Sequence, residues 1–478
     1  MLTSLFRDED AQALFDCVPE MMQTAAMANK QFVRPTSDEL VSVRKTILEF
    51  VSKKERKMTG SWAHNMAMLL VVPESARECQ KGDDDALQFF SPDPVGDVIN
   101  LTDKIYSEHG FKYVQAREGR SHISFKITVE FACVCIVWYA PSRVFNSIPI
   151  MSGHHWCSGI GSQVQMPMPI VVSPIFQFNS YLRVLNDPFT SYWKLDTVLP
   201  RLMELQRAFP MILEFPQGGG GGNEQQTIPM SLELALLIEW AAGHPTCASV
   251  GDHARLFFAS AAGIELSRTI RQLALVSVDY VTDLVDVVRL LKTVCGGEGL
   301  VKVQEFNELT DMLGRRAIIR VGGETILNMI DAAGRAVPVI DKAPDGLLVA
   351  GFTYCVANTL AMWFLASMNR SNAQHYHSCL LHDMLRFRSS NLSATATDPS
   401  SPFRDIQLSY IGEPKTEMQV HMDMVNLRRR AANGNYATMW LSYDPTKPKA
   451  RPFKYRLPHC DGSRTPPKHS VMASVVVV

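Results

Sequence analysis

The chain has 478 residues, of which 46% are hydrophobic and 20% are charged, and its formal net charge is −1. This length allows two or three domains with cores of their own, and the balanced charge excludes a global field that would attract nucleic acid. Ten cysteines without paired spacing, and no signal-peptide pattern, favour a reducing compartment over a disulfide framework. No apolar run in the sequence reaches the roughly 18–20 residues that cross a bilayer. We therefore expect a soluble intracellular protein with no membrane partner.

The first part of the chain is predicted to contain an N-terminal helical region and then a mixed core. Residues 1–58 are expected to be helical, because apolar residues recur at helical spacing between Leu40 and Val51. Residues 59–150 alternate strand-like and helical patterns, which is typical of an α/β unit. Residues 151–216 include an aromatic segment, predicted as one long helix over 174–212, that should pack on this core.

Five consecutive glycines, Gly218–Gly222, indicate an internal boundary. Fixing the backbone of such a run has a large entropic cost, so residues 217–228 are predicted to form a glycine-rich linker or mobile loop. Residues 229–456 would then form a C-terminal domain, and residues 457–478 a disordered tail.

The pattern within this C-terminal domain changes from helical to strand-like and back. Residues 229–294 are strongly helical in period, and residues 314–330 turn strand-like. A second helical stretch runs from about 351 to 368, and residues 389–403 have the composition of a loop. Residues 404–456 are expected to be β-strands with basic connections.

The most informative pattern lies in residues 85–98, where Phe89-Phe90-Ser91-Pro92-Asp93-Pro94 is followed by Gly96-Asp97-Val98. A Gly60-Ser61 turn precedes it, and such a turn lets backbone amides approach phosphates. Two acids at i and i+2 of a strand point to one face. With a third acid from a neighbouring strand they can hold two divalent cations for phosphoryl chemistry. The stretch resembles the active-site strand of a nucleotidyltransferase, which would place it at the mouth of a nucleotide site.

These blocks and several later ones resemble the poly(A) polymerase catalytic subunits of large nucleocytoplasmic DNA viruses, of the poxvirus and giant-virus type. The later blocks are His109-Gly110-Phe111-Lys112-Tyr113-Val114, Phe125-Lys126-Ile127, Tyr139-Ala140-Pro141, Val144-Phe145-Asn146, Ile148-Pro149, Tyr181-Leu182-Arg183, Asp187-Pro188, Ser191-Tyr192-Trp193-Lys194-Leu195, Gly314-Arg315-Arg316, Ile411-Gly412-Glu413-Pro414 and Tyr443-Asp444-Pro445. The match extends in order over residues 55–450, which is harder to obtain by chance than any single motif.

The resemblance implies a fold of mixed α/β and α+β class, with a nucleotidyltransferase (polymerase-beta-like) core followed by a second, degenerate transferase-like domain. It implies a role in polyadenylation of mRNA 3′ ends, with ATP as substrate and Mg²⁺ or Mn²⁺ as cofactor if the chain is active. RNA is the implied partner, together with a second protein chain in a homodimer or in a heterodimer with an active paralogue. The implied location is the host cytoplasm, in the viral factory, with packaging in the virion as a further option.

The chain departs from this family at the catalytic acids. The pair that directly precedes the aromatic block falls on Ala86 and Gln88, and the third acid falls on Ile136. Asn179 and Thr197 stand where the family has aspartate and lysine. Alanine and isoleucine cannot hold a metal ion, and a neutral amide is a poor substitute for a carboxylate. We therefore expect an inactive transferase site, and the alternative function is that of an RNA-binding or scaffolding subunit.

A shifted register offers another interpretation. The segment from Gly82 to Gln88 resembles the Gly-Asp-x-Asp-x-Leu-Gln of poxvirus members, which would place Asp83 and Asp85 on one face as ligands of Mg²⁺ or Mn²⁺. Gly60 and Ser61 would then receive the triphosphate. Glu130 lies about 20 Å from Ile136 along an extended strand, which is too far to supply the third acid without a bulge or an altered register. In the alternative, the aspartates form a solvated turn and the strand begins at residue 86.

A basic C-terminal segment is the best candidate for RNA binding. Aromatic residues are interleaved with its cations, a mixture that suits phosphate contacts and base stacking. A solvated basic edge would have the same composition. The candidate cations are Arg428, Arg429, Arg430, Lys447, Lys449, Arg451 and Lys454.

The segment from His375 to His382 contains residue types that bind metals. Zinc sites usually combine two well-spaced pairs of ligands, and this segment does not show that pattern. We expect its histidines to be ordinary structural or surface residues.

Overall fold

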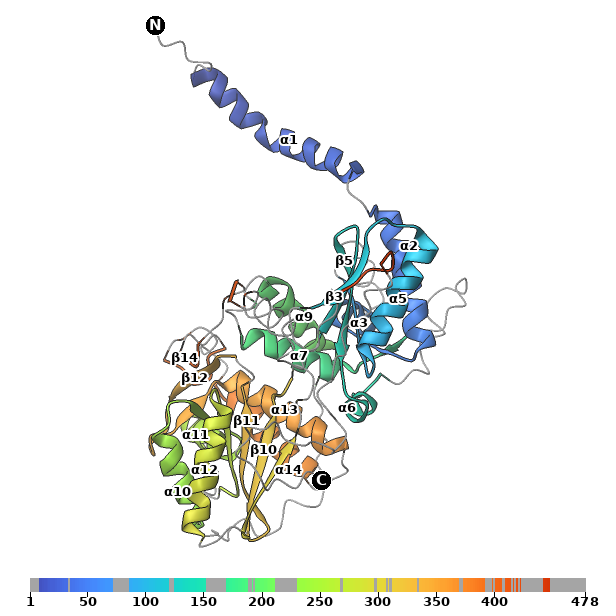
Figure 1. Ribbon diagram of the computed structural model, residues 1–478. Coiled ribbons are helices and arrows are strands. Elements are labelled where there is room, and N and C mark those ends of the chain that lie inside the picture. The colour runs from blue at the N-terminus through green and yellow to red at the C-terminus, as the bar shows by residue number, and fades with distance from the viewer. Residues whose placement is uncertain are drawn as a thin grey trace.

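Two β-sheets, each covered by helices, make up the computed structural model shown in Figure 1. The structure describes residues 8–32, 35–71, 86–119, 124–151, 169–187, 191, 194–210, 230–266, 270–295, 299–306, 308, 312–332, 335–368, 373–391, 398, 400–405, 409–413, 416, 418–419, 422 and 442–447. Within these ranges, no helix combines the length and apolar character that a membrane crossing requires. The predicted linker 217–228 and tail 457–478 lie outside the described residues.

The first sheet has seven strands in the order β15-β3-β4-β5-β2-β1-β6. The strands are β1 (Lys57–Thr59), β2 (Leu87–Ser91), β3 (Val114–Glu118), β4 (Ser124–Val129), β5 (Ala132–Tyr139), β6 (Ile170–Val171) and β15 (Ser442–Tyr443). The helices of this first unit are α1 (Asp8–Phe32), α2 (Ser37–Lys53), α3 (Gly60–Val71), α5 (Pro94–His109), α6 (Ser142–Ser147), α7 (Pro174–Leu185) and α9 (Leu195–Ala208).

The second sheet has eight strands in the order β14-β12-β13-β7-β8-β11-β10-β9. The strands are β7 (Cys247–Val250), β8 (Leu273–Ser277), β9 (Val301–Phe306), β10 (Arg316–Val321), β11 (Glu324–Asp331), β12 (Val337–Lys342), β13 (Leu348–Ala350) and β14 (Tyr410–Ile411). The helices of this second unit are α10 (Leu232–Ala242), α11 (Asp252–Ala261), α12 (Tyr280–Val294), α13 (Phe352–Met368) and α14 (Ala373–Ser389).

The second sheet repeats the topology of the first. The order β3-β4-β5-β2-β1-β6 corresponds strand for strand to β9-β10-β11-β8-β7-β13. The parallel pairs also correspond, since β2 pairs with β5 and β1 with β6, while β8 pairs with β11 and β7 with β13. The structure confirms the predicted mixed fold, and this repeat shows that the second unit resembles the first.

Helix α2 shows how the N-terminal sequence dictates local structure. Thr36 and Glu39 form a capping box, in which Glu39 N donates to Thr36 Oγ1 and Thr36 N donates to the Glu39 carboxylate. Val43, Ile47 and Val51 are fully buried against the first sheet, as the helical spacing predicted. Helix α1 instead extends away from the rest of the molecule in Figure 1.

The single long helix predicted over 174–212 is wrong. The structure has two helices there, because α7 ends at Leu185 and α9 begins at Leu195. The Asn186 backbone amide caps α7, and the next residue, Asp187, precedes a proline in the sequence. A proline disfavours helical backbone at the residue before it, which explains the break.

Strand β15 corrects the extent of the predicted C-terminal domain. Although Ser442 and Tyr443 belong to the predicted range 229–456, they pair with β3 in the first sheet. Tyr443 is buried there and its hydroxyl donates to Asp103 Oδ1 at 2.5 Å. Of the strands predicted over 404–456, the described residues contain β14 and β15, one in each sheet.

A continuous hydrophobic core joins the two units. Phe176 on α7 is fully buried, and its ring lies 5.8 Å from that of Phe90 on β2 and 5.7 Å from that of Phe364 on α13. Each unit also has a smaller core of its own, one between the first sheet and α2 and α5, and one beneath α10 and α12. The two sheets are therefore joined through α7 and α13.

Candidate nucleotide and RNA site

The Gly60-Ser61 turn begins α3 at the end of β1. Gly60 has φ +72, and a Cβ atom there would lie 2.9 Å from the Cδ of Gln88. Only glycine meets both conditions without strain. The turn that should receive a phosphate is therefore covered on one side by the Gln88 amide.

The strand register brings the predicted acid positions together. Thr59 on β1 pairs with Gln88 on β2, and Gln88 pairs with Ile136 on β5. The Gln88 side-chain oxygen accepts a hydrogen bond from Trp138 Nε1 at 3.1 Å. Ala86 directly precedes β2 and is half-buried. The three positions predicted for the catalytic carboxylates therefore hold one amide and two aliphatic side chains.

These residues do not fit a divalent cation. Mg²⁺ requires several hard oxygen ligands, and Gln88 offers one neutral oxygen that already accepts from Trp138. Within the part of the chain that the structure describes, no group of three His, Cys, Asp or Glu side chains is placed to hold a metal. Asp83 and Asp85 lie outside the described residues, so the shifted register stays a prediction.

Glu130 is held in a turn that has no connection with the acid positions. It has φ +45 between β4 and β5, and its Oε1 accepts from the backbone amides of Lys112 and Tyr113 at 2.8 and 3.2 Å. The side chain therefore fixes the loop before β3.

Two polar contacts between α3 and α9 escaped the sequence analysis. Arg201 Nη1 donates to Ser61 Oγ at 2.6 Å, and His64 Nε2 lies 3.0 Å from Glu204 Oε2. His64 is fully buried; burial lowers its pKa and the charge of Arg201 lowers it further, whereas Glu204 opposes both effects. Arg201 stands one helical turn after Thr197. Thr197 is the position at which the resemblance predicts a lysine. Ser61 and Glu204 each have a second polar residue three positions away, His64 and Arg201, and this spacing indicates one polar face on each helix.

The Ser-Pro-Asp-Pro block has a structural role: a network of hydrogen bonds through Ser91, Asp93 and Asp97, here called the bracket, joins strand β2 to helix α5. Ser91 Oγ donates to Asp97 Oδ2 at 2.5 Å and accepts from the Asp93 amide at 3.0 Å. Asp93 caps α5 by accepting from the Gly96 amide, and Arg56 binds Asp97 through Nε at 2.6 Å. The block thus ties β2 to the start of α5.

Other family blocks also have structural roles here. Lys57 is buried, and its ammonium group donates to the carbonyls of Phe145 and Ile148 at 2.5 and 2.9 Å, while burial lowers its pKa to about 8. Asn179 is fully buried, and its Oδ1 has no hydrogen-bond partner among the described residues. The contacts of Lys57 hold α6 against β1.

The second unit repeats the turn without the acids. Gly251 has φ +70 at the end of β7, and a Cβ atom there would meet Ala274 on β8. Ala274 pairs with Asn328 on β11, as Gln88 pairs with Ile136. Asp252 replaces Ser61 after this glycine and is buried, which raises its pKa. The second site is therefore degenerate.

Of the predicted RNA-binding residues, the structure describes Lys447. Its side chain is exposed, and its Nζ lies 3.8 Å from Asp444 Oδ2. The other six lie outside the described residues: Arg428, Arg429, Arg430, Lys449, Arg451 and Lys454.

The histidine-rich segment lies on α14. His377 is buried, and burial together with the charge of Arg316 lowers its pKa to about 4. His382 is exposed and lies 3.7 Å from Asp383. Their different environments support structural and surface roles.

Comparisons with known proteins agree with this geometry. Residues 45–191 match the family model for the poly(A) polymerase catalytic subunit. A protein named "Putative poly(A) polymerase catalytic subunit" from Acanthamoeba polyphaga mimivirus is 22% identical over 356 residues, covering 70% of this chain and 58% of that protein. An identically named protein of African swine fever virus (isolate Pig/Kenya/KEN-50/1950) is 29% identical over 114 residues, covering 24% of this chain and 23% of that one.

A solved structure shares the whole fold. The crystal structure of the Megavirus polyadenylate synthase aligns with a TM-score of 0.70 at 20% sequence identity, covering 94% of this chain and 88% of that one. The chain thus spans most of that structure but 58% of the length of the mimivirus relative.

Proposed function

Because the chain belongs to the family of poly(A) polymerase catalytic subunits of large DNA viruses, we propose that it acts in polyadenylation of viral mRNA as a homologue without adenylyl-transfer activity. In this role it binds RNA and assembles either with itself or with an active paralogue. We place this activity in the host cytoplasm, at the viral factory.

One observation supports the proposal that the chain lacks adenylyl-transfer activity. Gln88 and Ile136 face each other across β2 and β5 beside Gly60, at the acid positions of the family pattern. A pocket without anionic oxygens cannot retain the cations that stabilise a transferring nucleotidyl group. Arg201, which binds Ser61, adds positive charge to this place and does not replace a carboxylate.

The test is a primer-extension assay with the full chain. Labelled ATP and an RNA primer are incubated with Mg²⁺ or Mn²⁺, and RNA binding is measured in parallel by fluorescence anisotropy. We expect salt-sensitive RNA binding without extension. Binding should weaken when Arg428, Arg429 and Arg430 are replaced together by alanine. Absence of RNA binding would leave only a structural role in assembly.

The competing function is active adenylyl transfer in the shifted register. It is favoured by the position of Asp83 and Asp85, directly before the residue that precedes β2. Extension that is abolished by Asp83→Ala or Asp85→Ala would establish it. Asp84→Ala is the matched control, because the shifted register would direct the middle aspartate to the opposite face.

A further inference from the structure

Two aromatic side chains, here called the ring platform, lie exposed at the end of the first sheet where β4 turns into β5. Phe131 occupies the turn and is 78% exposed, and Tyr113, directly before β3, is 39% exposed. Their ring centres lie 5.2 Å apart, with 34° between the ring planes. Among the described residues of β3, β4, β5 and the loops between them, these two are the exposed large hydrophobic side chains. Two rings offer too little apolar surface for a stable protein interface, but they match a nucleobase in size.

The backbone under the Phe131 ring is strained. Val129 pairs with Ala132, so Glu130 and Phe131 form a two-residue turn, in which their φ values are +45 and +71. Turns of this kind usually contain Asn-Gly, because glycine adopts positive φ without steric cost. A phenylalanine in this conformation is rare, and here most of its ring faces solvent. The packing of the ring therefore does not explain the strain.

The ring platform is ordered before any ligand arrives. The Glu130 carboxylate accepts through Oε1 from the backbone amides of Lys112 and Tyr113 at 2.8 and 3.2 Å. The Glu130 amide in turn donates to the Tyr113 carbonyl at 2.8 Å. These bonds hold Tyr113 beside Phe131, which lowers the entropic cost of binding a ligand there. Lys112 is exposed, and its Nζ lies 5.0 Å from the centre of the Tyr113 ring, so a cation stands beside the rings.

Strand β15 brings the predicted RNA-binding segment to the same end of the sheet. It runs antiparallel to β3, with Ser442 opposite Arg117 and Tyr443 opposite Ala116. The chain after Tyr443 therefore leaves the sheet at the end where β3 begins and where β4 turns into β5. Lys447, the first of the predicted RNA-binding cations after β15, is exposed and follows four residues later. An RNA strand bound by this segment would thus start next to the ring platform.

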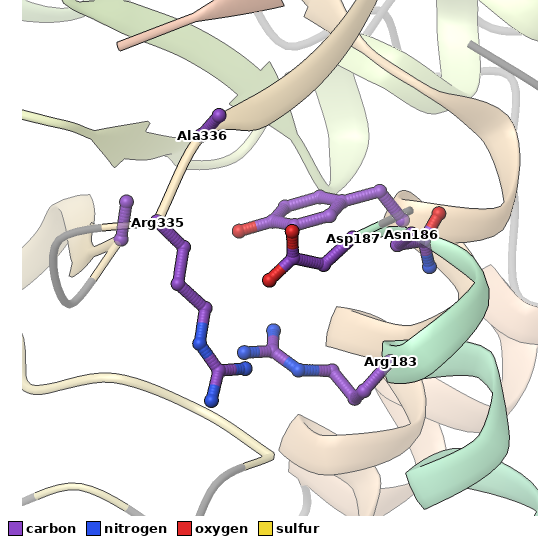
Figure 2. Close-up of a pocket in the computed structure, with 7 residues that line it drawn as sticks. Arg183, Asn186, Asp187, Arg335 and Ala336 are labelled. Carbon is purple, nitrogen blue, oxygen red and sulfur yellow. The ribbon is translucent and has the colours of Figure 1, made fainter. Parts of the chain in front are cut away.

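The end of α7 offers no comparable surface. The pocket in Figure 2, where Arg183 and Asp187 of the first unit meet Arg335 of the second, has room for about one water molecule. Asp187 shares its lining with the two arginines, so part of their charge is already compensated within the protein.

We propose that the ring platform stacks an unpaired base of single-stranded RNA and that Lys112 contacts the adjoining phosphate. Stacking tolerates any sequence, because every base has a π face, and a nearby cation adds an attraction to the backbone. The bases of an RNA duplex are stacked on each other and do not present a free face, so the ligand is a single strand. This inference deepens the proposed RNA-binding function and rests on it.

The test compares ring variants of the full chain by anisotropy, with a fluorescein-labelled RNA single strand and a duplex of the same length. Phe131→Gly removes the ring and relieves the backbone strain, so the melting temperature should stay at or above the wild-type value. Its single-strand affinity should fall about tenfold without a change in salt dependence, and its duplex affinity should not change. Phe131→Trp should retain wild-type affinity. The matched control Phe15→Ala removes a ring that is 70% exposed on α1 and should leave every affinity unchanged.

Lys112→Ala tests the phosphate contact separately. It should weaken single-strand binding and lower the slope of log K against log salt by about 0.7, since one cation fewer displaces counterions from the strand. An unchanged slope would overturn the role of Lys112.

The remaining outcomes separate the ring platform from the proposed function. If the wild-type chain binds the single strand and Phe131→Gly binds it equally well, the ring platform is overturned while RNA binding stands. If Phe131→Gly instead changes the sedimentation of the chain and leaves RNA binding unchanged, the ring belongs to a protein interface and the RNA assignment is overturned. If the wild-type chain binds no RNA at all, the proposed RNA-binding function fails, and the ring platform fails with it.

Discussion

At the residue scale, the Gln88 side chain lies so close to residue 60 that only glycine fits there without strain. Its amide has nearly the shape of a glutamate side chain, so the turn at Gly60 keeps the close approach that a phosphate site would need. What differs is charge, since the oxygen that would bind a cation accepts instead from Trp138.

Replacement of Gly60 by alanine tests this close contact. Alanine suffers backbone strain at φ +72 and also a contact of 2.9 Å with Gln88. We expect the free energy of unfolding to fall by about 2–3 kcal/mol. Gly110→Ala is the control, because Gly110 has φ +65 with no atom within 4 Å of a Cβ, and should cost about 1 kcal/mol.

Denaturant titration measures both changes. In a Gln88→Ala background, Gly60→Ala should cost about as much as Gly110→Ala, because the steric contact is absent there. Gln88→Ala alone is the reference, since it also loses the hydrogen bond from Trp138. Equal losses for Gly60→Ala and Gly110→Ala would show that Gln88 does not cover the turn.

His377 makes stability depend on pH. Its folded pKa of about 4 lies below the ordinary value of 6.5, so the unfolded chain binds a proton first as the pH falls. Stability is therefore complete above about pH 6.5 and is lost as the pH falls toward 4. Between pH 7 and 5 we expect a loss of about 2 kcal/mol from this residue.

His377→Asn should remove this part of the pH dependence, measured as the free energy of unfolding at pH 7 and 5. His382→Asn is the control on the same helix, because 47% of the His382 side chain is exposed. A wild-type pH dependence in His377→Asn would contradict the assignment.

At the element scale, the two strand–helix brackets share geometry and differ in charge. Ser277 Oγ donates to Asp283 Oδ2 as Ser91 does to Asp97. Asp97 also binds Arg56, whereas Asp283 accepts from the neutral donors of Thr246 and Cys247. The second unit has kept the bracket that joins a strand to its helix without the ion pair.

We therefore expect Ser277→Ala to destabilise the protein more than Ser91→Ala. Losing the serine leaves Asp283 buried with neutral donors only, while Asp97 retains its arginine. The expected losses in the free energy of unfolding are about 2–3 kcal/mol for Ser277→Ala and about 1 kcal/mol for Ser91→Ala. Chemical denaturation of both variants checks the order, and the reverse order would sink the argument.

At the scale of the whole molecule, Phe176 couples the two units. Phe176→Ala should lower the free energy of unfolding by about 3–5 kcal/mol, since the ring is fully buried between Phe90 and Phe364. Hydrogen exchange should rise in peptides from both β2 and α13. Phe89→Ala is the control, because Phe89 is equally buried but belongs to the core of the first unit. Its effect should stay in that unit, and equal exchange patterns would refute the coupling.

The sequence predicted those helices and strands that are marked by a local pattern or by an ordered series of motifs. Helical spacing located α2, and the block around Ser91 located β2. The break between α7 and α9 was missed because aromatic periodicity continued across it. The bond from Arg201 to Ser61 joins residues 140 apart in the chain. The spacing of polar residues indicates a polar face on each helix but does not tell which two distant helices pack together.

Strand β15 has a consequence for biosynthesis. Tyr443 and its partner Asp103 are 340 residues apart, so the edge of β3 stays uncovered until residue 443 has left the ribosome. At ordinary translation speeds this interval lasts on the order of half a minute. An open strand edge invites pairing with neighbouring nascent chains. The protein should therefore depend on chaperones during synthesis.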